Sequence, residues 1–320
     1  MTEKQVAAII VAGPTGSGKS ALALALAERF AGTIINADSQ QIYRDLAILT
    51  VRPNMEETAR VPHRLYGIID AAENCSVGQW LKLARVEIAA ASAAGRVPIL
   101  VGGTGLYIEA LLRGLAELPP IPEALREEAR ALYARLGGAA FHAELARLDP
   151  GAAARLPSSD RQRLTRAYEV AKATGVPLSE WQRRQSSGTT LNAAVILLLP
   201  PRDELYAICD ARVLHMLEAG AAAELRALLG RRLSPRLSAM KAVGVRELGA
   251  WLRQEASKEE AVAAMQQATR HYVKRQFTWF RRRLPETGQI RKLVLNAQFS
   301  ESLLPEIFSF IRGFLLTESD

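Results

Sequence analysis

The segment that decides the fold is GPTGSGKS, residues 13–20. It follows the apolar run AAIIVA at 7–12 and precedes ALALALAERF at 21–30, which has a helical composition. A glycine-rich turn between a buried strand and a helix brings backbone N–H groups together around an anion, and the positive end of the helix dipole points at the same place. The segment therefore predicts a phosphate-binding loop.

Two residues of this loop supply further phosphate-binding groups. Lys19 brings a mobile positive charge to the outer phosphates, and the hydroxyl of Ser20 can bind a magnesium ion. The loop alone does not identify a nucleoside triphosphate, because a diphosphate that departs as a leaving group also fits it. We predict a diphosphate site made of the whole loop: Gly13, Pro14, Thr15, Gly16, Ser17, Gly18, Lys19 and Ser20.

An acidic residue closes each of two further strand-like runs. Asp38 closes GTIINAD at 32–38. The carboxyl ends of parallel strands face the ligand crevice, so Asp38 is a candidate base, with capping of the next turn as the alternative. Asp70 closes LYGIID at 65–70 and could hold magnesium as the second acid of ATPases and GTPases does. Because this run is short and broken by a glycine, we prefer a structural role for Asp70.

The first part of the chain alternates strand-like runs with helical ones, an order typical of a parallel sheet covered on both faces. The glycines that end one run, RVPILVGG, allow close approach to a ligand, so Thr104 directly after them is a candidate contact; a plain turn is the alternative. The strand-like runs lie at 7–12, 32–38, 65–70, 96–103, 193–200 and 292–297.

Between residues 119 and 190 the apolar runs give way to helical sequence with charged faces. The stretch opens with LPPIP and closes with QSSGTT at 185–190, and such borders are typical of an inserted subdomain. Helices are expected at Glu123–Leu136, Ala139–Leu148 and Asp160–Thr174. The sequence thus predicts an α/β fold. Its P-loop NTPase-like parallel sheet core comes from 1–118 and 191–320, with basic C-terminal helices, and an inserted all-helical subdomain comes from 119–190.

The composition of the chain limits the class of protein and the kinds of site that it can contain. The chain of 320 residues is 49% hydrophobic, which is enough for a large core, and no apolar run is long enough for a membrane span. The N-terminal MTEKQV has no signal-peptide pattern, so we expect a cytoplasmic protein. The cysteines and histidines lack metal-ligand spacing, which argues against a zinc site. We expect a monomer, because no apolar patch is left over for pairing.

The net charge of +8 is unevenly distributed along the chain. Residues 229–283 carry 13 basic and 4 acidic side chains, which accounts for most of the excess. A long polyanion is the expected partner of such a segment, because each phosphate contact releases counterions. A solvated surface that keeps the protein soluble is the alternative.

Several blocks of the sequence form an ordered series: GPTGSGKS, DSQQIYR, VGGTGLY, DRQRLTRAYEV, RVLHMLEAG, MKAVGVRE and ATRHYVKRQFTWFRR. In this order, from about Ile9 to Arg282, the chain resembles the tRNA dimethylallyltransferases, also called tRNA isopentenyltransferases. The resemblance implies transfer of a dimethylallyl group from dimethylallyl diphosphate, bound with Mg²⁺, to N6 of the adenine on the 3′ side of the anticodon. It implies Asp38 as the base, and Thr15 and Arg212 as contacts of the diphosphate.

The resemblance also implies which residues meet the anticodon stem-loop of tRNA. They are Asp38, Ser39, Gln40, Gln41, Thr104, Arg126, Gln162, Arg163, Leu164, Thr165, Arg166, Lys241, Ala242, Val243, Gly244, Val245, Arg246 and Glu247. On the helix expected at 160–174, Leu164 falls on the apolar face, which leaves Arg163 and Arg166 free to meet phosphates. The target adenine must leave its stack to be reached.

The chain departs from the family pattern at two places. AILTVRP at 47–53 has Leu49 where the family usually has a glycine, and Val245 replaces the usual tyrosine. Neither departure removes a residue that we assign to the chemistry.

Other functions also fit parts of the pattern. An ATP-dependent small-molecule kinase would use the loop for ATP and Asp38 as the base for an alcohol. An RNA-binding protein with a nucleotide switch would bind tRNA without making a product. Prenyltransferases that act on free adenosine nucleotides share the loop and the Asp38 motif, but the helical insertion and its arginines favour tRNA.

Overall fold

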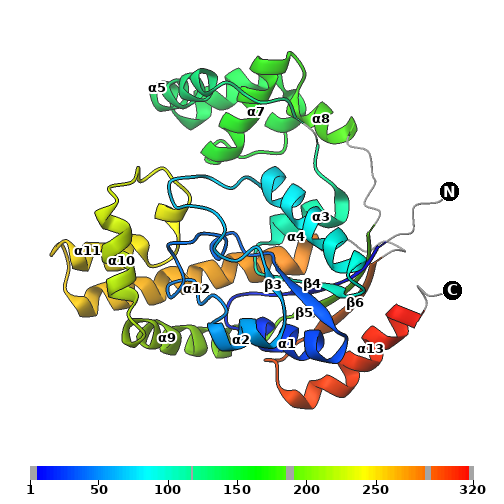
Figure 1. Ribbon diagram of the computed structural model, residues 1–320. Helices are drawn as coiled ribbons and strands as arrows, with labels where there is room; N and C mark the ends of the chain where they lie inside the picture. Colours follow the sequence, from blue (N-terminus) through cyan, green and yellow to red (C-terminus); the bar gives the residue numbers. More distant parts are fainter. Residues whose placement is uncertain (1–5, 117, 185–190, 285–289, 317–320) are drawn as a thin grey trace. The chain divides into compact units, whose positions relative to one another are not determined.

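The computed structural model describes residues 6–116, 118–184, 191–284 and 290–316. The chain divides into two compact units, residues 1–112 with 190–320 and residues 113–189 (Figure 1). The border QSSGTT that we predicted at 185–190 lies outside the described residues.

The first unit is built on a six-stranded sheet in the order β3-β2-β4-β1-β5-β6, with every strand pair parallel. The strands are β1 (Val6–Ala12), β2 (Gly32–Asn36), β3 (His63–Arg64), β4 (Val97–Gly102), β5 (Leu191–Leu198) and β6 (Ile290–Leu295). β5 follows the second unit in the sequence and pairs directly with β1, Val11 opposite Ile196. The chain therefore returns to the same sheet after the insertion, as the sequence predicts.

Helices cover both faces of the sheet. Successive side chains of a strand point to opposite faces, so each strand packs against helices on both sides. Ile9 and Val11 of β1 pack on the face covered by α1 (Lys19–Arg29) and α13 (Leu304–Leu316) (Figure 1). The opposite face packs against α3 (Val77–Ala93), α4 (Gly105–Arg113), α9 (Arg202–Glu218), α10 (Ala221–Gly230), α11 (Val245–Leu252) and α12 (Lys258–Arg283). The remaining elements of this unit are α2 (Met55–Arg60), η1 (Ala239–Lys241) and η2 (Glu301–Leu303). This layering confirms the α/β fold class.

The strand expected at 65–70 is wrong. β3 ends at Arg64, and Leu65 and Gly67 have φ angles of 64° and 60°, which interrupt an extended chain. Asp70 therefore lies in a turn, where its carboxylate accepts a hydrogen bond from the backbone N–H of Ala72 at 2.8 Å and pairs with Arg231 at 2.6 Å. These contacts fit the structural role that we preferred for Asp70.

Among the described residues of the second unit, all regular secondary structure is helical. Its helices are α5 (Glu123–Leu148), α6 (Pro150–Ala153), α7 (Arg161–Thr174) and α8 (Leu178–Arg184). Gly137 interrupts α5 with a φ of 73° and a ψ of 172°, which separates the two helices expected on either side of it. Phe141, Leu145 and Leu164 are fully buried and form the small core of this unit.

Within the described part of the chain, none of the helices combines the length and the hydrophobicity that a membrane span needs.

Candidate active site

The phosphate loop runs from the end of β1 to the start of α1 and depends on close backbone packing. A Cβ atom on Gly13 would lie 2.4 Å from the carbonyl oxygen of Leu198 at the end of β5. Gly18 has a φ of 85°, and a Cβ there would lie 2.7 Å from that of Phe299. Side chains at these positions would strain the loop or push its neighbours away. The loop is therefore shaped by glycine, as the sequence predicts.

Two cations lie at this loop. Lys19 donates from Nζ to the carbonyl oxygen of Pro14 at 2.6 Å. Burial lowers the pKa of Lys19 to about 8, although the nearby Asp38 opposes this shift. Arg212, on α9, donates from Nη2 to the hydroxyl of Thr15 at 2.7 Å.

Arg212 is incompletely satisfied by the protein. Its Nε is buried and has no hydrogen-bond partner among the described residues. A buried charged donor without a partner is costly, and an oxyanion is the group that best satisfies a guanidinium. The Thr15, Lys19 and Arg212 side chains thus form a site suited to a phosphate or diphosphate group.

Asp38 lies two residues beyond β2 and is held by the side chain of Asn36. The Asn36 Oδ1 accepts from the backbone N–H of Asp38 at 2.8 Å, and its Nδ2 donates to the Asp38 carbonyl oxygen at 3.0 Å. The Asp38 carboxylate interacts electrostatically with Lys19 and Arg212. It also accepts from the backbone N–H of Gln40 at 2.9 Å. Asp38 therefore caps the next turn and lies near the cations of the loop, so the two interpretations of this residue are compatible.

A second group of predicted residues gathers next to Asp38. The Thr104 hydroxyl, after β4, accepts from the backbone N–H of Ser39 at 2.9 Å and donates to the Ser39 hydroxyl at 3.1 Å. The side chain of Gln40 accepts from the backbone N–H of Val243 at 3.2 Å. Gln41 instead donates to the carbonyl oxygens of Thr50 and Val51, at 2.9 Å each. The structure thus brings positions 38–41, 104 and 243 together beyond the carboxyl ends of β2 and β4.

The segment 241–247 lies between η1 and the first turn of α11. Lys241 and Arg246 are exposed, whereas the Ala242 and Val245 side chains are buried. The backbone N–H of Gly244 donates to Glu247 at 3.1 Å. Only the two basic side chains of this segment are therefore well placed for contact with a large partner.

Two residues that the sequence analysis did not select lie at the centre of this unit. Gln276, on α12, accepts from the backbone N–H of Thr15 at 2.9 Å and donates to the carbonyl oxygen of Gly103 at 2.9 Å. Tyr272, one turn earlier, is hydrogen-bonded to the side chains of Gln40 and Thr104, and burial raises its pKa. The signal that could have revealed Gln276 is a polar residue on the buried face of a helix, next to Val273 and Phe280.

The helical unit holds the remaining predicted residues, and here one expectation is wrong. Arg163 and Arg166 are not free: Arg163 pairs with Asp160 at 2.5 Å and Arg166 with Glu169 at 3.4 Å. Asp160 caps α7 and Glu169 lies on it, each three residues from its arginine. The pair of the exposed Arg163 contributes only about 0–1 kcal/mol, so a phosphate can replace its acid, whereas Glu169 is buried.

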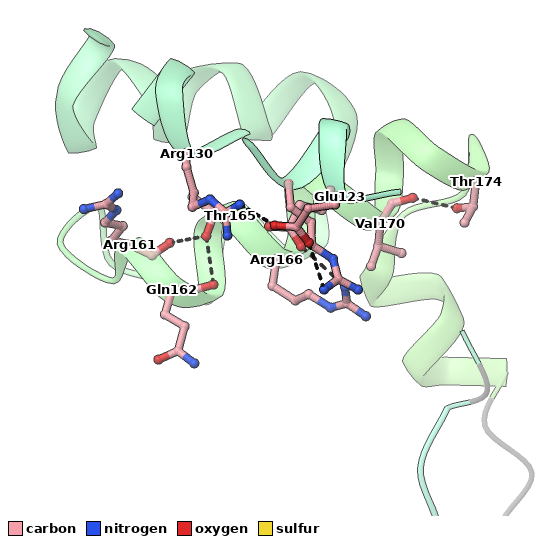
Figure 2. Close-up of polar contacts among 10 residues, drawn as sticks. Glu123, Arg130, Arg161, Gln162, Thr165, Arg166, Val170 and Thr174 are labelled. Atoms are coloured by element: carbon pink, nitrogen blue, oxygen red, sulfur yellow. Dashed lines mark hydrogen bonds and ion pairs between the residues drawn. The ribbon is translucent and has the colours of Figure 1, made fainter. Parts of the chain in front are cut away.

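Figure 2 shows Arg166 and Thr165 on α7 near Glu123 and Arg130 on α5. Arg126 shares Glu123 with Arg130, at 3.5 Å and 2.6 Å respectively. The hydroxyl of Thr165 donates to the backbone of its own helix, and Leu164 is fully buried. Gln162 is exposed. The side chains of positions 164 and 165 are thus occupied within the unit and are not exposed for the tRNA contact that the resemblance implies.

The donor set for a metal ion is sparse. Within the described ranges, no group of three or more histidine, cysteine, aspartate or glutamate side chains could hold one. Ser20 is exposed in the first turn of α1, next to Lys19. Magnesium bound with phosphates usually takes one or two protein oxygens and completes its shell with phosphate oxygens and water. The residues present fit that arrangement, with the Ser20 hydroxyl as the protein ligand.

The fold and this site define a P-loop-like α/β protein in which two cations at a glycine-rich loop lie near a carboxylate. Comparison with known proteins identifies its family. Residues 41–283 match the family model described as IPP transferase. The tRNA dimethylallyltransferase of Rhodospirillum rubrum is 54% identical over 311 residues, which cover 97% of this chain and 95% of that relative. The chain therefore belongs to the IPP transferase family.

Solved structures agree with this assignment. A tRNA isopentenylpyrophosphate transferase from Bacillus halodurans is 32% identical with a TM-score of 0.69, and the match covers 99% of this chain and 98% of that one. A eukaryotic dimethylallyltransferase acting on tRNA is 25% identical with a TM-score of 0.80, over 96% of this chain and 80% of that one. The family resemblance read from the sequence is confirmed, and the protein is a transferase.

Proposed function

We propose that this protein transfers the dimethylallyl group of dimethylallyl diphosphate to N6 of the adenine 3′-adjacent to the anticodon of tRNA. The observation that carries the proposal is the buried Arg212 with an unsatisfied Nε at the phosphate loop, in electrostatic contact with Asp38. In one site, the leaving diphosphate would then bind Arg212 and the incoming amine would meet Asp38. The names of the relatives support the same reaction.

The anion site would act on the leaving group. As the C–O bond of an allylic diphosphate stretches, the carbon fragment becomes cationic and negative charge grows on the diphosphate oxygens. Lys19, Arg212 and the Thr15 hydroxyl are already held by hydrogen bonds within the protein. Donors fixed before the reaction stabilise such charge without reorganising, and this is commonly the largest contribution to catalysis.

Asp38 would act on the acceptor. The exocyclic amine of adenine is a weak nucleophile, because its lone pair is delocalised into the ring. A carboxylate that takes the amine proton as the new C–N bond forms removes this barrier. The Asn36 side chain accepts from the Asp38 N–H and donates to the Asp38 carbonyl, which fixes the backbone of Asp38. The backbone N–H of Gln40 bonds to the carboxylate at Oδ1, and Oδ2 would take the proton.

Mg²⁺ is the cofactor that this chemistry needs, and the Ser20 hydroxyl would hold it. When bound, the ion neutralises charge on the diphosphate. The protein's own contribution remains the loop amides and the two cations.

The tRNA side of the proposal rests on the residues near Asp38, the exposed Lys241 and Arg246, and the arginines of the helical unit. We propose that the target adenine is extruded from its loop, at a cost of a few kcal/mol that phosphate contacts offset. A cytoplasmic location fits a tRNA substrate, and we propose that one chain is sufficient for the reaction. A small-molecule kinase is not favoured, because the family and the named relatives are transferases of prenyl groups to tRNA.

The decisive test is transfer of label from dimethylallyl diphosphate to unmodified tRNA in the presence of Mg²⁺. Asp38→Asn keeps the shape of the side chain but removes the base, so we expect a loss of about 10²–10⁴-fold in kcat. Asp70→Asn is the matched control: Asp70 pairs with Arg231 outside the loop, and its activity should stay within about twofold of wild type. Transfer at the normal rate by Asp38→Asn would refute the base assignment. Phosphoryl transfer from ATP to an alcohol would favour the kinase.

A further inference from the structure

One buried side chain joins two loops that are far apart in the sequence. Gln276 is 6% exposed, and its amide reaches the phosphate loop with one end and the loop after β4 with the other. Its oxygen accepts from the Thr15 N–H, and its nitrogen donates to the Gly103 carbonyl. Because the first partner is a donor and the second an acceptor, only an amide in this one orientation satisfies both.

We propose that Gln276 is a positioning residue for the diphosphate: it holds the backbone of Thr15 so that the Thr15 hydroxyl meets Arg212 in the anion site. The inference rests on the proposed function, in which a diphosphate is the leaving group. It assigns to α12 a role in the chemistry beyond packing and charge.

The contacts of residues 14 and 15 support this role. Three different residues hold three groups of this short segment: Lys19 binds the Pro14 carbonyl, Arg212 the Thr15 hydroxyl, and Gln276 the Thr15 N–H. The Thr15 N–H is therefore hydrogen-bonded within the protein. Without Gln276, the peptide between Pro14 and Thr15 would keep only the Lys19 contact at its carbonyl oxygen, and its N–H would lose its side-chain partner, so the direction of the Thr15 hydroxyl would be less fixed. Misplacement by about 1 Å is enough to weaken a preorganised site strongly.

Tyr272 strengthens the argument, because it lies one turn before Gln276 on the same helix. It is hydrogen-bonded to Gln40 and Thr104, which are next to Asp38. One rigid helix therefore supports both the anion loop and the loops near the candidate base.

The loop after β4 offers an independent way to disturb Gln276. A Cβ on Gly103 would lie 2.2 Å from the Gln276 Nε2, which is the far end of a flexible side chain. Gly103→Ala should therefore displace the amide while leaving the rest of the fold in place. This variant should reproduce the effect of changing Gln276 itself.

The test measures binding of inorganic pyrophosphate with Mg²⁺ by titration calorimetry, without tRNA. Gln276→Met and Gly103→Ala should each raise the Kd about tenfold, the effect of losing one well-placed hydrogen bond. Thr269→Val is the matched control on the same helix: its buried hydroxyl bonds to the Met265 carbonyl of the helix itself, and its Kd should change less than about twofold. An unchanged Kd in both Gln276→Met and Gly103→Ala would overturn the proposal.

A double variant separates positioning from general destabilisation. In a Thr15→Val background the hydroxyl is absent, so Gln276→Met should raise the Kd less than about threefold. An equal change in both backgrounds would show that Gln276 does not act through the Thr15 hydroxyl, and would overturn the inference. In the transfer assay, Gln276→Met should raise the KM for dimethylallyl diphosphate while the KM for tRNA stays the same. Absence of transfer by the wild-type protein would instead refute the proposed function, because the pyrophosphate titrations do not depend on it.

Discussion

At the scale of the residue, the site depends on cations that the protein itself only partly satisfies. Lys19 bonds to a backbone carbonyl and Arg212 to a hydroxyl, and neither has a hydrogen-bonded carboxylate among the described residues. Burial therefore acts on both cations and lowers the pKa of each. Such a site gains most from an anion, because binding the anion restores the favourable environment of the charges.

This arrangement predicts a pH dependence of diphosphate binding. The pKa of Lys19 is lowered to about 8, so in the free protein its charge is present below that pH and lost above it. Affinity for pyrophosphate should therefore fall between about pH 8 and 9 relative to Lys19→Arg, which stays charged throughout. Calorimetry of both proteins at pH 7, 8 and 9 gives the ratio of their Kd values. A constant ratio would contradict the role of burial at Lys19.

At the scale of the element, α6 and α8 of the helical unit share one buried carboxylate. The Asp149 side chain is fully buried and accepts from the Ala152 N–H at 2.8 Å, the Ser179 hydroxyl at 2.6 Å and the Ser179 N–H at 3.0 Å. Burial opposes the charge of Asp149, but the hydrogen bonds from Ser179 and Ala152 outweigh it and lower the pKa. Short helices such as these depend on tertiary contacts for their stability.

Asp149→Ala should therefore destabilise the helical unit by about 2–4 kcal/mol. The contribution of Asp149 is fully present above the unfolded pKa of about 3.9, and it is lost as the pH falls through the lowered folded pKa. Hydrogen exchange read by mass spectrometry on peptides from α6 to α8 measures the change locally. Glu144→Ala is the control, since Glu144 makes an exposed pair with Arg147 and its loss should cost under about 1 kcal/mol. Equal protection in both variants would count against the contacts described.

At the scale of the whole molecule, charge is the property most relevant to a nucleic-acid partner. The net charge is +8, and residues 229–283 hold most of the excess. Several of these cations lie on exposed surface, among them Lys241 and Arg246. A surface of this kind binds a polyanion by releasing counterions, so affinity depends on salt concentration.

The logarithm of the association constant for tRNA should fall linearly as the logarithm of the salt concentration rises. Lys241→Ala with Arg246→Ala should make that slope shallower by about 1–2, because each removes one phosphate contact. Arg60→Ala is the control: Arg60 lies on α2, outside the positions predicted to contact tRNA, and its loss should leave the slope unchanged. Filter-binding titrations over a range of salt concentrations provide the comparison. If the double variant has the wild-type slope, positions 241 and 246 do not contact phosphate.

The sequence by itself determined the features that depend on local pattern. Glycine spacing defines the glycine-rich loop, alternating apolar runs define the parallel sheet, and Asp38 follows the second strand closely enough to lie near the cations of that loop. The same kind of inference failed at 65–70, because positive φ angles at Leu65 and Gly67 do not show in an apolar pattern.

Only the tertiary structure showed how distant residues meet at the site. Gln276 meets Thr15 across 261 residues of chain, and Arg212 meets it across 197. No local periodicity encodes such contacts, because they exist only once α9 and α12 have packed on the sheet. The ion pairs of Arg163 and Arg166 were likewise settled by side-chain geometry, since a helical pattern fixes the face of a residue but not the rotamer that chooses its partner.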